Sequence, residues 1–595
     1  MNHRILTTAV LLATFADPVG FSAQGPTLPP PAGVSNARTL RVGVEARGGA
    51  AIQRPPRDVR ERAVGTASVR GRVVTADTGA PIRRAQIRAV SPESRETRLV
   101  TTDAEGRFEL RDLPAGRWEL TASKGGFVTM RYGQRRPFEA GRPIEIADGQ
   151  ILQQVNFALP RGAVIAGRLV DEFGEPVAGA RVQALRYQLS QGTRRLAPGG
   201  MMAVTDDTGA FRLYGLMPGE YYVSAVLRAL PSDDTNDTTG YAPTYYPGTG
   251  SVTEAQPISL GIAEEANVAF ALMPVRTARI SGNVVSSMGL PLLNGLVVLF
   301  AADAVGGPPA AFGAGNRIRP DGTFVLSNVA PGSYTLMGTT GGPGGRGAGG
   351  DVELGLVPVT VAGEDVTGLT IVTGRGATLA GTVVAAQGSR AGVPRTGVQV
   401  AAQMVGGAAF GLPGFGGPGG FGNRPATSGE DGAFTLTNLF GPRLIRVTGL
   451  PQDWMLESVI VEGRDVTDTP VELGPNEAIT GARIVLTDRV TEVSGSVLGA
   501  DGKPSRDYTV LLFPDDEARW TAPSRYVRPA RPDQEGLFKV RALPPHDRYL
   551  AVAVDYLEQG EEGDAELLAS LRGRATAFRL RPGESTAVTL KLVER

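Results

Sequence analysis

The chain has 595 residues, with 60 Lys plus Arg and 60 Asp plus Glu, so its formal net charge is zero. At about 100–150 residues per domain, this length predicts several hydrophobic cores, and the balanced charge argues against nucleic acid as a partner. The chain contains no Cys and only two His, which excludes disulfides, thiolate metal sites and Cys nucleophiles. We predict no cofactor.

The first 23 residues have the pattern of a secretory signal peptide. A positive region ends at Arg4, an apolar stretch covers residues 5–16, and small residues suited to cleavage follow up to Ala23. This stretch is shorter than the roughly 20 residues that span a bilayer, so no membrane span is expected in the mature form. We expect an exported protein, periplasmic, cell-surface or secreted; a buried amino-terminal helix is the alternative. Residues 24–65 lack an apolar period and predict a disordered linker.

Two short signatures then recur five times along the chain. The first is a glycine within an apolar strand, usually followed by a turn that contains Pro; its glycines are Gly71, Gly167, Gly282, Gly381 and Gly495. The second is Gly-x-Phe followed by a Pro-Gly turn and an aromatic residue, with degenerate copies near the end; its first glycines are Gly106, Gly209, Gly322, Gly432 and Gly536. Consecutive glycines of the second signature are 103, 113, 110 and 104 residues apart, so each repeat is a whole domain.

The residues of both signatures are those of β-structure. Alternation such as Phe108-Glu109-Leu110 sends every second side chain to one face of a half-buried strand. The phenylalanine and the aromatic residue after Pro-Gly are interpreted as core anchors between two facing sheets. The sequence therefore predicts an all-β chain of tandem sandwiches, with domains at residues 66–160, 161–274, 275–374, 375–487 and 488–595.

One short helix is predicted in the last domain, over residues 564–574. Asp564 is placed to cap its amino end, and Leu567, Leu568 and Leu571 lie on one face. We expect this helix to cover a sheet edge, which would otherwise invite aggregation.

The combined pattern resembles the carboxypeptidase regulatory-like domain. It runs from Gly71 to Leu120 and again from Gly167 to Val223, and the later repeats depart progressively. The resemblance implies a transthyretin-like, seven-stranded Greek-key sandwich and a non-catalytic accessory module, related to carbohydrate-binding-like folds. Residues 241–249 and the last 140 residues also resemble large secreted proteins of acidobacteria. Fold by itself does not assign an activity.

The sequence offers no catalytic residue and no metal site. A zinc carboxypeptidase needs two His and a carboxylate, whereas the expected mature chain retains only His546, which is interpreted as a turn residue. Paired carboxylates such as Asp206-Asp207 and Asp233-Asp234 lie in predicted turns. They leave a carboxylate-dependent hydrolase open as an alternative.

Two aromatic clusters are candidates for contact with a polysaccharide or a partner protein. The first contains Tyr241, Tyr245 and Tyr246, spaced by prolines; the alternative is a loop folded onto its own domain. The second places arginines beside rings to clasp an acidic glycan or carboxylate, and consists of Trp520, Arg525, Tyr526 and Arg528. The alternative for the second cluster is an ion-pair network with Asp515, Asp516 and Glu517.

These observations lead to one functional hypothesis with two rivals. The first is an exported, non-catalytic binding or scaffold protein that adheres to polysaccharide or to envelope proteins. The rivals are a purely structural spacer of the envelope and the carboxylate-dependent hydrolase.

Overall fold

The computed structural model describes residues 65–91, 96–136, 138–190, 192–227, 239–292, 295–301, 317–340, 352–389, 392–405 and 425–595. The predicted signal peptide (1–23) and all but the last residue of the predicted linker (24–65) lie outside the described residues. Residues 63–595 form one compact unit.

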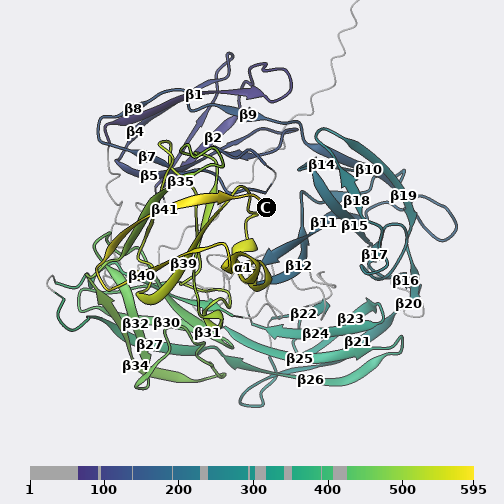
Figure 1. The fold of residues 1–595 in the computed structure, drawn as a ribbon. Coiled ribbons are helices and arrows are strands. Elements are labelled where there is room, and N and C mark those ends of the chain that lie inside the picture. Colours follow the sequence, from purple (N-terminus) through teal and green to yellow (C-terminus); the bar gives the residue numbers. More distant parts are fainter. Residues whose placement is uncertain are drawn as a thin grey trace, which may run out of the picture. The chain divides into compact units, whose positions relative to one another are not determined.

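The described residues are mostly strands, and they contain a single α-helix (Figure 1). The strands form five successive groups, which we call sandwiches 1 to 5, and each group buries its own apolar core. The prediction of an all-β chain of tandem sandwiches is confirmed.

Sandwich 1 contains β1 (Ala67–Thr75), β2 (Gln86–Val90), β3 (Thr97–Thr101), β4 (Arg107–Leu113), β5 (Gly116–Ser123), β6 (Met130–Arg131), β7 (Ile144–Ile146), β8 (Ile151–Leu152) and β9 (Phe157–Leu159). Sandwich 2 contains β10 (Ala163–Val170), β11 (Arg181–Ser190), β12 (Thr193–Pro198), β13 (Ala203–Val204), β14 (Ala210–Leu216), β15 (Gly219–Val226), β16 (Thr239–Tyr241), β17 (Thr244–Tyr245), β18 (Ile258–Leu260), β19 (Glu265–Ala271) and β20 (Pro274–Arg276).

Sandwich 3 contains β21 (Ala278–Ser286), β22 (Leu296–Ala301), β23 (Thr323–Val329), β24 (Gly332–Thr339), β25 (Glu353–Val361) and β26 (Val366–Arg375). Sandwich 4 contains β27 (Ala377–Ala385), β28 (Gln399–Met404), β29 (Ala426–Thr427), β30 (Ala433–Leu439), β31 (Arg443–Thr448), β32 (Met455–Val461), β33 (Arg464–Asp465) and β34 (Ala478–Thr487). Sandwich 5 contains β35 (Glu492–Leu498), β36 (Thr509–Pro514), β37 (Arg528–Ala530), β38 (Leu537–Arg541), β39 (His546–Val554), α1 (Ala565–Arg572), β40 (Thr576–Leu580) and β41 (Ser585–Val593).

In all five sandwiches the first strand lies between an antiparallel and a parallel neighbour, whereas the later pairing varies, since β32 of sandwich 4 joins the first sheet beside β34. In sandwich 1, β1 lies between β4, which is antiparallel to it, and β8 and β9, which are parallel to it. The facing sheet has the order β3-β2-β5-β6, with β7 also on β5. The chain thus crosses between the sheets in the Greek-key manner. In sandwiches 3 and 5 the two sheets join at one corner, through the pairs β25–β26 and β39–β41.

The two sequence signatures meet in the register of the first sheet. In every sandwich the signature glycine lies directly opposite the signature phenylalanine; the pairs are Gly71 and Phe108, Gly167 and Phe211, Gly282 and Phe324, Gly381 and Phe434, and Gly495 and Phe538. A Cβ on any of these glycines would lie 1.8 to 2.2 Å from a carbonyl oxygen of the chain segment on the other side. Glycine therefore permits the close approach of the last strand.

The aromatic residue after the Pro-Gly turn is a hydrogen-bonded core anchor. Trp118 Nε1 donates to Pro114 O at 3.1 Å, and Tyr221 Oη donates to Met217 O at 2.8 Å. Tyr334 and Tyr549 each donate to an upstream carbonyl in the same way, at 2.8 Å. These bonds satisfy polar atoms in the core, as buried aromatic hydroxyl and indole groups require.

Sandwich 4 places an arginine at the anchor position. Ala402 pairs with Ile445 as Ala184 pairs with Val223, so Arg443 occupies the position of Tyr221. Arg443 is 1% exposed and donates to Phe440 O at 3.0 Å and Ala402 O at 3.3 Å. Burial lowers the pKa of its guanidinium to about 10.

The predicted helix is present but covers a sheet face rather than an edge. Asp564 accepts hydrogen bonds from the backbone N–H of Glu566 at 3.0 Å and Leu567 at 3.4 Å, as an N-cap does. The leucine face of α1 packs on the side of β36 and β39 that points away from the sandwich core, through residues such as Phe513 and Val552. β36 is therefore buried on both faces.

We predict that Gly71→Ala destabilises sandwich 1 by about 2 kcal/mol, because the new methyl group overlaps Val155 O and the Phe108 ring. Gly125→Ala is the matched control, since nothing lies within 4 Å of its Cβ position. Hydrogen exchange of the β1 and β4 amides measures the effect. Equal exchange in both variants would contradict the steric role of Gly71.

We predict that Arg443→Tyr raises the stability of sandwich 4 by about 1 kcal/mol, because a neutral anchor replaces a desolvated cation. Arg443→Lys should lower the stability, since one ammonium cannot make both carbonyl contacts in the guanidinium geometry. Thermal unfolding of the two variants checks the prediction, which fails if the tyrosine variant unfolds first.

Candidate functional site

The segment between β6 and β7 of sandwich 1 lies against sandwich 5 and buries a carboxylate there. Glu139 is 3% exposed, and its Oε1 accepts from Arg531 Nη1 at 2.5 Å. Its Oε2 accepts from the backbone N–H groups of Arg135 at 3.0 Å and Arg136 at 3.2 Å. Burial lowers the pKa of Arg531, which is itself 5% exposed. Neither charge is left without a partner in the interior.

Further polar contacts surround this pair and join the same two sandwiches. Asp507 lies 3.0 Å from Arg135, 3.1 Å from Arg142 and 3.4 Å from Arg531. Arg136 pairs with Asp555 at 3.0 Å. We call this set of contacts between sandwiches 1 and 5 the 1–5 interface.

Sandwich 2 contacts the same region through Arg186. Its Cζ lies 3.2 Å from the centroid of the Phe138 ring, and its Nη2 donates to Glu558 Oε2 at 2.8 Å. Phe138 comes from sandwich 1 and Glu558 from sandwich 5, so one guanidinium links three sandwiches. Phe138 also has a φ of 61°, a conformation that bulky residues rarely adopt without a functional or structural cause.

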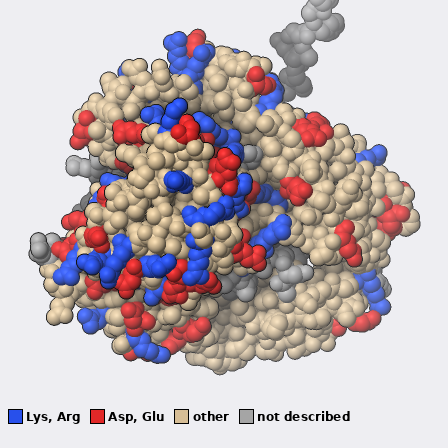
Figure 2. Space-filling model, viewed as in Figure 1, with Lys and Arg blue, Asp and Glu red and all other residues tan. Residues whose placement is uncertain are grey.

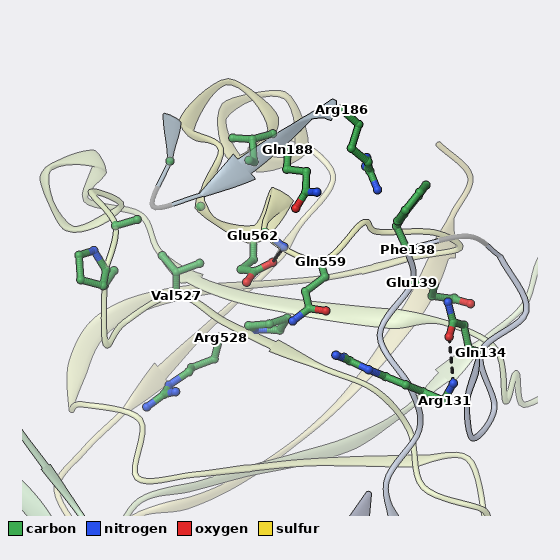
Figure 3. A pocket seen from close by; sticks show the side chains of 18 of the residues that line it. Arg131, Gln134, Phe138, Glu139, Arg186, Gln188, Val527, Arg528, Gln559 and Glu562 are labelled. Carbon is green, nitrogen blue, oxygen red and sulfur yellow. Dashed lines mark hydrogen bonds between the residues drawn. The ribbon is translucent and has the colours of Figure 1, made fainter. Parts of the chain in front are cut away.

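A cavity of about 930 Å³ lies where these three sandwiches meet (Figure 3). Its walls come from the strand and turn around β6 in sandwich 1, the β11–β12 hairpin in sandwich 2, and two loops of sandwich 5 that begin at Trp520 and Gln559. The volume falls within the range of about 300–1,000 Å³ typical of ligand sites.

The polar side chains of the cavity divide into two groups. Glu139 and Arg186 have the partners described above, and Glu562 accepts from Gly560 N at 2.8 Å. Arg131, Arg528 and Gln559 line the cavity and are exposed, and their side chains make no hydrogen bond or ion pair with any part of the chain that the structure describes. The Thr129 hydroxyl also lines the cavity without a bonded partner in the described residues, so the uncommitted groups are two guanidinium groups, one amide and one hydroxyl.

The predicted tyrosine cluster lies on its own sandwich. Tyr241 Oη donates to Glu172 Oε2 at 2.7 Å, and burial, followed by Glu172, raises the pKa of Tyr241 to about 12. Tyr246 packs against the core of sandwich 2, with its ring 6.0 Å from that of Phe270. Tyr245 is half-buried in β17, which pairs with β15. This arrangement matches the alternative of a loop folded onto its own domain.

The second predicted cluster is divided by the fold. Trp520 is 3% exposed, and its Nε1 donates to Pro514 O at 2.7 Å, so its ring packs in a core. Arg525 binds Asp468 of sandwich 4 through two bonds of 2.8 and 3.2 Å, and Tyr526 Oη donates to the same carboxylate at 3.1 Å.

The acidic residues expected to pair with Arg525 form ion pairs with other arginines. Asp515 pairs with Arg548 and Arg572, Asp516 with Arg519, and Glu517 with Arg572. Of the two arginines in this cluster, Arg528 lines the cavity and has no hydrogen bond or ion pair among the described residues. Sequence reasoning missed Arg131 and Gln559, because no local pattern distinguishes them from other surface residues.

Chemistry based on histidine or metal has no support from the described part of the chain. His546 begins β39, with its Nδ1 3.2 Å from Arg548 N, and its ring packs edge-on against Tyr526 and Tyr549. No group of three or more metal-ligating side chains occurs within the described ranges. None of the helices in these ranges has the length and hydropathy needed to cross a membrane. Figure 2 shows basic and acidic side chains interspersed over the visible face.

Comparison with known proteins identifies one domain. Residues 68–160, which coincide with sandwich 1, match the family model of the carboxypeptidase regulatory-like domain. No curated protein matches the chain.

Several solved structures align at low identity. The TIE protein of Bacillus anthracis is 16% identical, with 52% of this chain and 51% of that protein covered and a TM-score of 0.15. The chain thus spans about half the length of the TIE protein. The minor pilin GBS52 of Streptococcus agalactiae is 12% identical, with 36% and 97% covered and a TM-score of 0.21. The major pilin subunit BcpA of Bacillus cereus is 12% identical, with 52% and 99% covered and a TM-score of 0.13.

We predict that Arg531→Met lowers the free energy of unfolding by about 3–5 kcal/mol, because the Glu139 carboxylate stays buried without its cation. The double variant Arg531→Met with Glu139→Gln should recover most of this loss, since the neutral amide still accepts from the backbone. Chemical denaturation measures both.

Arg212→Gln is the control for this measurement. It removes an ion pair with Glu265 whose side chains are 54% and 43% exposed, and it should leave stability nearly unchanged. Equal stability of the Arg531→Met and Arg212→Gln variants would contradict the proposed importance of the buried pair.

Proposed function

We propose that this carboxypeptidase regulatory-like domain protein is a non-catalytic, exported scaffold that adheres to polysaccharide or to proteins of the cell envelope. The observation that carries the proposal is the junction of sandwiches 1, 2 and 5, where a buried ion pair and its surrounding contacts leave an open polar cavity.

The contacts of sandwich 5 support the scaffold part of the proposal. It bonds to sandwich 1 through the 1–5 interface, to sandwich 2 through Arg186 and Glu558, and to sandwich 4 through Arg525 and Asp468. Single exposed ion pairs contribute little, but a buried pair resists separation, because either charge alone would be left buried without its partner. Such contacts limit the independent motion of the sandwiches.

The cavity supports the binding part of the proposal. Its uncommitted side chains are guanidinium groups, an amide and the Thr129 hydroxyl, which bind by charge and hydrogen bonds, and no base is hydrogen-bonded to that hydroxyl among the described residues. Export rests on the amino-terminal pattern of Arg4, the apolar stretch and the small residues before Ala23.

We predict that one or more immobilised polysaccharides or envelope proteins from a panel of candidates bind the purified full chain. Mass spectrometry should show that the ligand is unchanged after incubation. Shortened or modified ligand after incubation would overturn the non-catalytic role. If no candidate in the panel bound the protein, adhesion would be overturned. The rival hypothesis of a purely structural spacer of the envelope would then be favoured.

A further inference from the structure

We propose that the cavity between sandwiches 1, 2 and 5 binds an acidic oligosaccharide whose sugar units carry carboxylates, through Arg131, Arg528 and Gln559. This inference rests on the proposed function and deepens it by naming the ligand class of the cavity.

The charges at the cavity determine the sign of the ligand. Glu139 is neutralised by Arg531, and the charge of Arg186 is balanced by Glu558. The carboxylate of Glu562 accepts from a backbone N–H and has no cation bonded to it, whereas Arg131 and Arg528 have no counter-charge bonded to them among the described residues, so the free cations outnumber the free carboxylates by one. Guanidinium forks bind carboxylates through paired hydrogen bonds, which favours an anionic ligand.

The spacing of the two arginines favours a ligand with repeated carboxylates. Figure 3 shows Arg131 and Arg528 on opposite sides of Gln559, with the Arg131 side chain extended toward the Gln559 amide and that of Arg528 directed away. Two separately placed cations suit carboxylates on different units of one chain better than one shared carboxylate. The amide between them can donate to and accept from sugar hydroxyl groups.

The cavity has the size and rigidity for such a ligand. About 930 Å³ accommodates several sugar units rather than a single small anion. Its walls are held by the buried Glu139–Arg531 pair and by the stacking of Arg186 on Phe138. Because these contacts fix the walls before binding, less ordering of the protein opposes association.

An acidic peptide is the competing ligand class, and the lining favours the saccharide. Tight peptide docking relies on large apolar or aromatic anchors buried in pockets of the receptor. The apolar lining residues Trp520 and Val527 are themselves buried in the core of sandwich 5, and Phe138 is covered by Arg186. Leu189, Met217 and Pro529 also line the cavity and are not buried, so apolar side chains accompany the polar groups there, but none of these three is aromatic.

The test is calorimetric titration of the full chain with oligogalacturonic acid, an oligosaccharide that carries one carboxylate on each sugar unit. We expect Arg131→Gln and Arg528→Gln each to lower the affinity about tenfold, and the double variant to lower it about a hundredfold, since the arginines contact different carboxylates. Arg83→Gln is the matched control, because Arg83 is exposed on the same sandwich as Arg131 and is absent from the cavity lining.

A second probe isolates the charge. The methyl-esterified oligosaccharide of the same length keeps its hydroxyl groups and loses its carboxylates, so it should bind at least tenfold more weakly to the unaltered protein. Binding of the free acid should also weaken as salt rises, because the interaction is between exposed charges.

Three outcomes overturn the inference. They are no binding of the free acid, equal binding of the acid and its ester, and binding of polyglutamate with comparable affinity that the same two substitutions abolish. If an immobilised neutral polysaccharide then still bound the protein, the proposed adhesion would stand, but the cavity would not be its binding site. Cleavage of the bound oligogalacturonic acid would instead overturn the non-catalytic role and leave the ligand class standing.

Discussion

The close approach of two parallel strands is the constraint on which each sandwich depends. The segment that leads into the last strand lies so near the first strand that Gly71 has the Val155 carbonyl oxygen where a side chain would begin, and Phe108 fills the space beside it. The same pair recurs at Gly495 and Phe538, more than 400 residues later. Divergence elsewhere is tolerated because it leaves this contact alone: sandwich 4 replaces its anchor aromatic with Arg443 and still buries a complete core.

A second kind of interaction, between charged side chains, joins sandwich 5 to sandwiches 1, 2 and 4. Apolar surfaces would associate without regard to partner, whereas the Glu139–Arg531 pair is favourable only when the correct two segments meet. The same contacts place side chains from three sandwiches around one cavity. The family match covers sandwich 1 alone, whereas the candidate site lies between sandwiches 1, 2 and 5. The family of one sandwich therefore does not describe the site.

The sequence predicts the fold well and the site poorly, for a physical reason. The Gly-x-Phe turn, the Pro-Gly turn and the cap at Asp564 act over a few residues, so their effect is visible in the local pattern. Arg525 illustrates the opposite case: its acidic neighbours were the expected partners, but it pairs with Asp468, 57 residues away in another sandwich. Trp520 looked like a surface ring because of the arginines after it, yet helix α1 and strand β36 bury it.

The bond between Glu139 and Arg531 spans 392 residues of sequence, and this distance affects how the protein is made. A chain that emerges amino end first completes the strands of sandwich 1 long before Arg531 is available. During that interval the Glu139 carboxylate has only backbone N–H groups to accept from, and the turn that carries it remains open to solvent. Synthesis of the Arg531 segment thus buries a turn of sandwich 1 made much earlier, so a chain that stops before Arg531 leaves the Glu139 carboxylate without its cation.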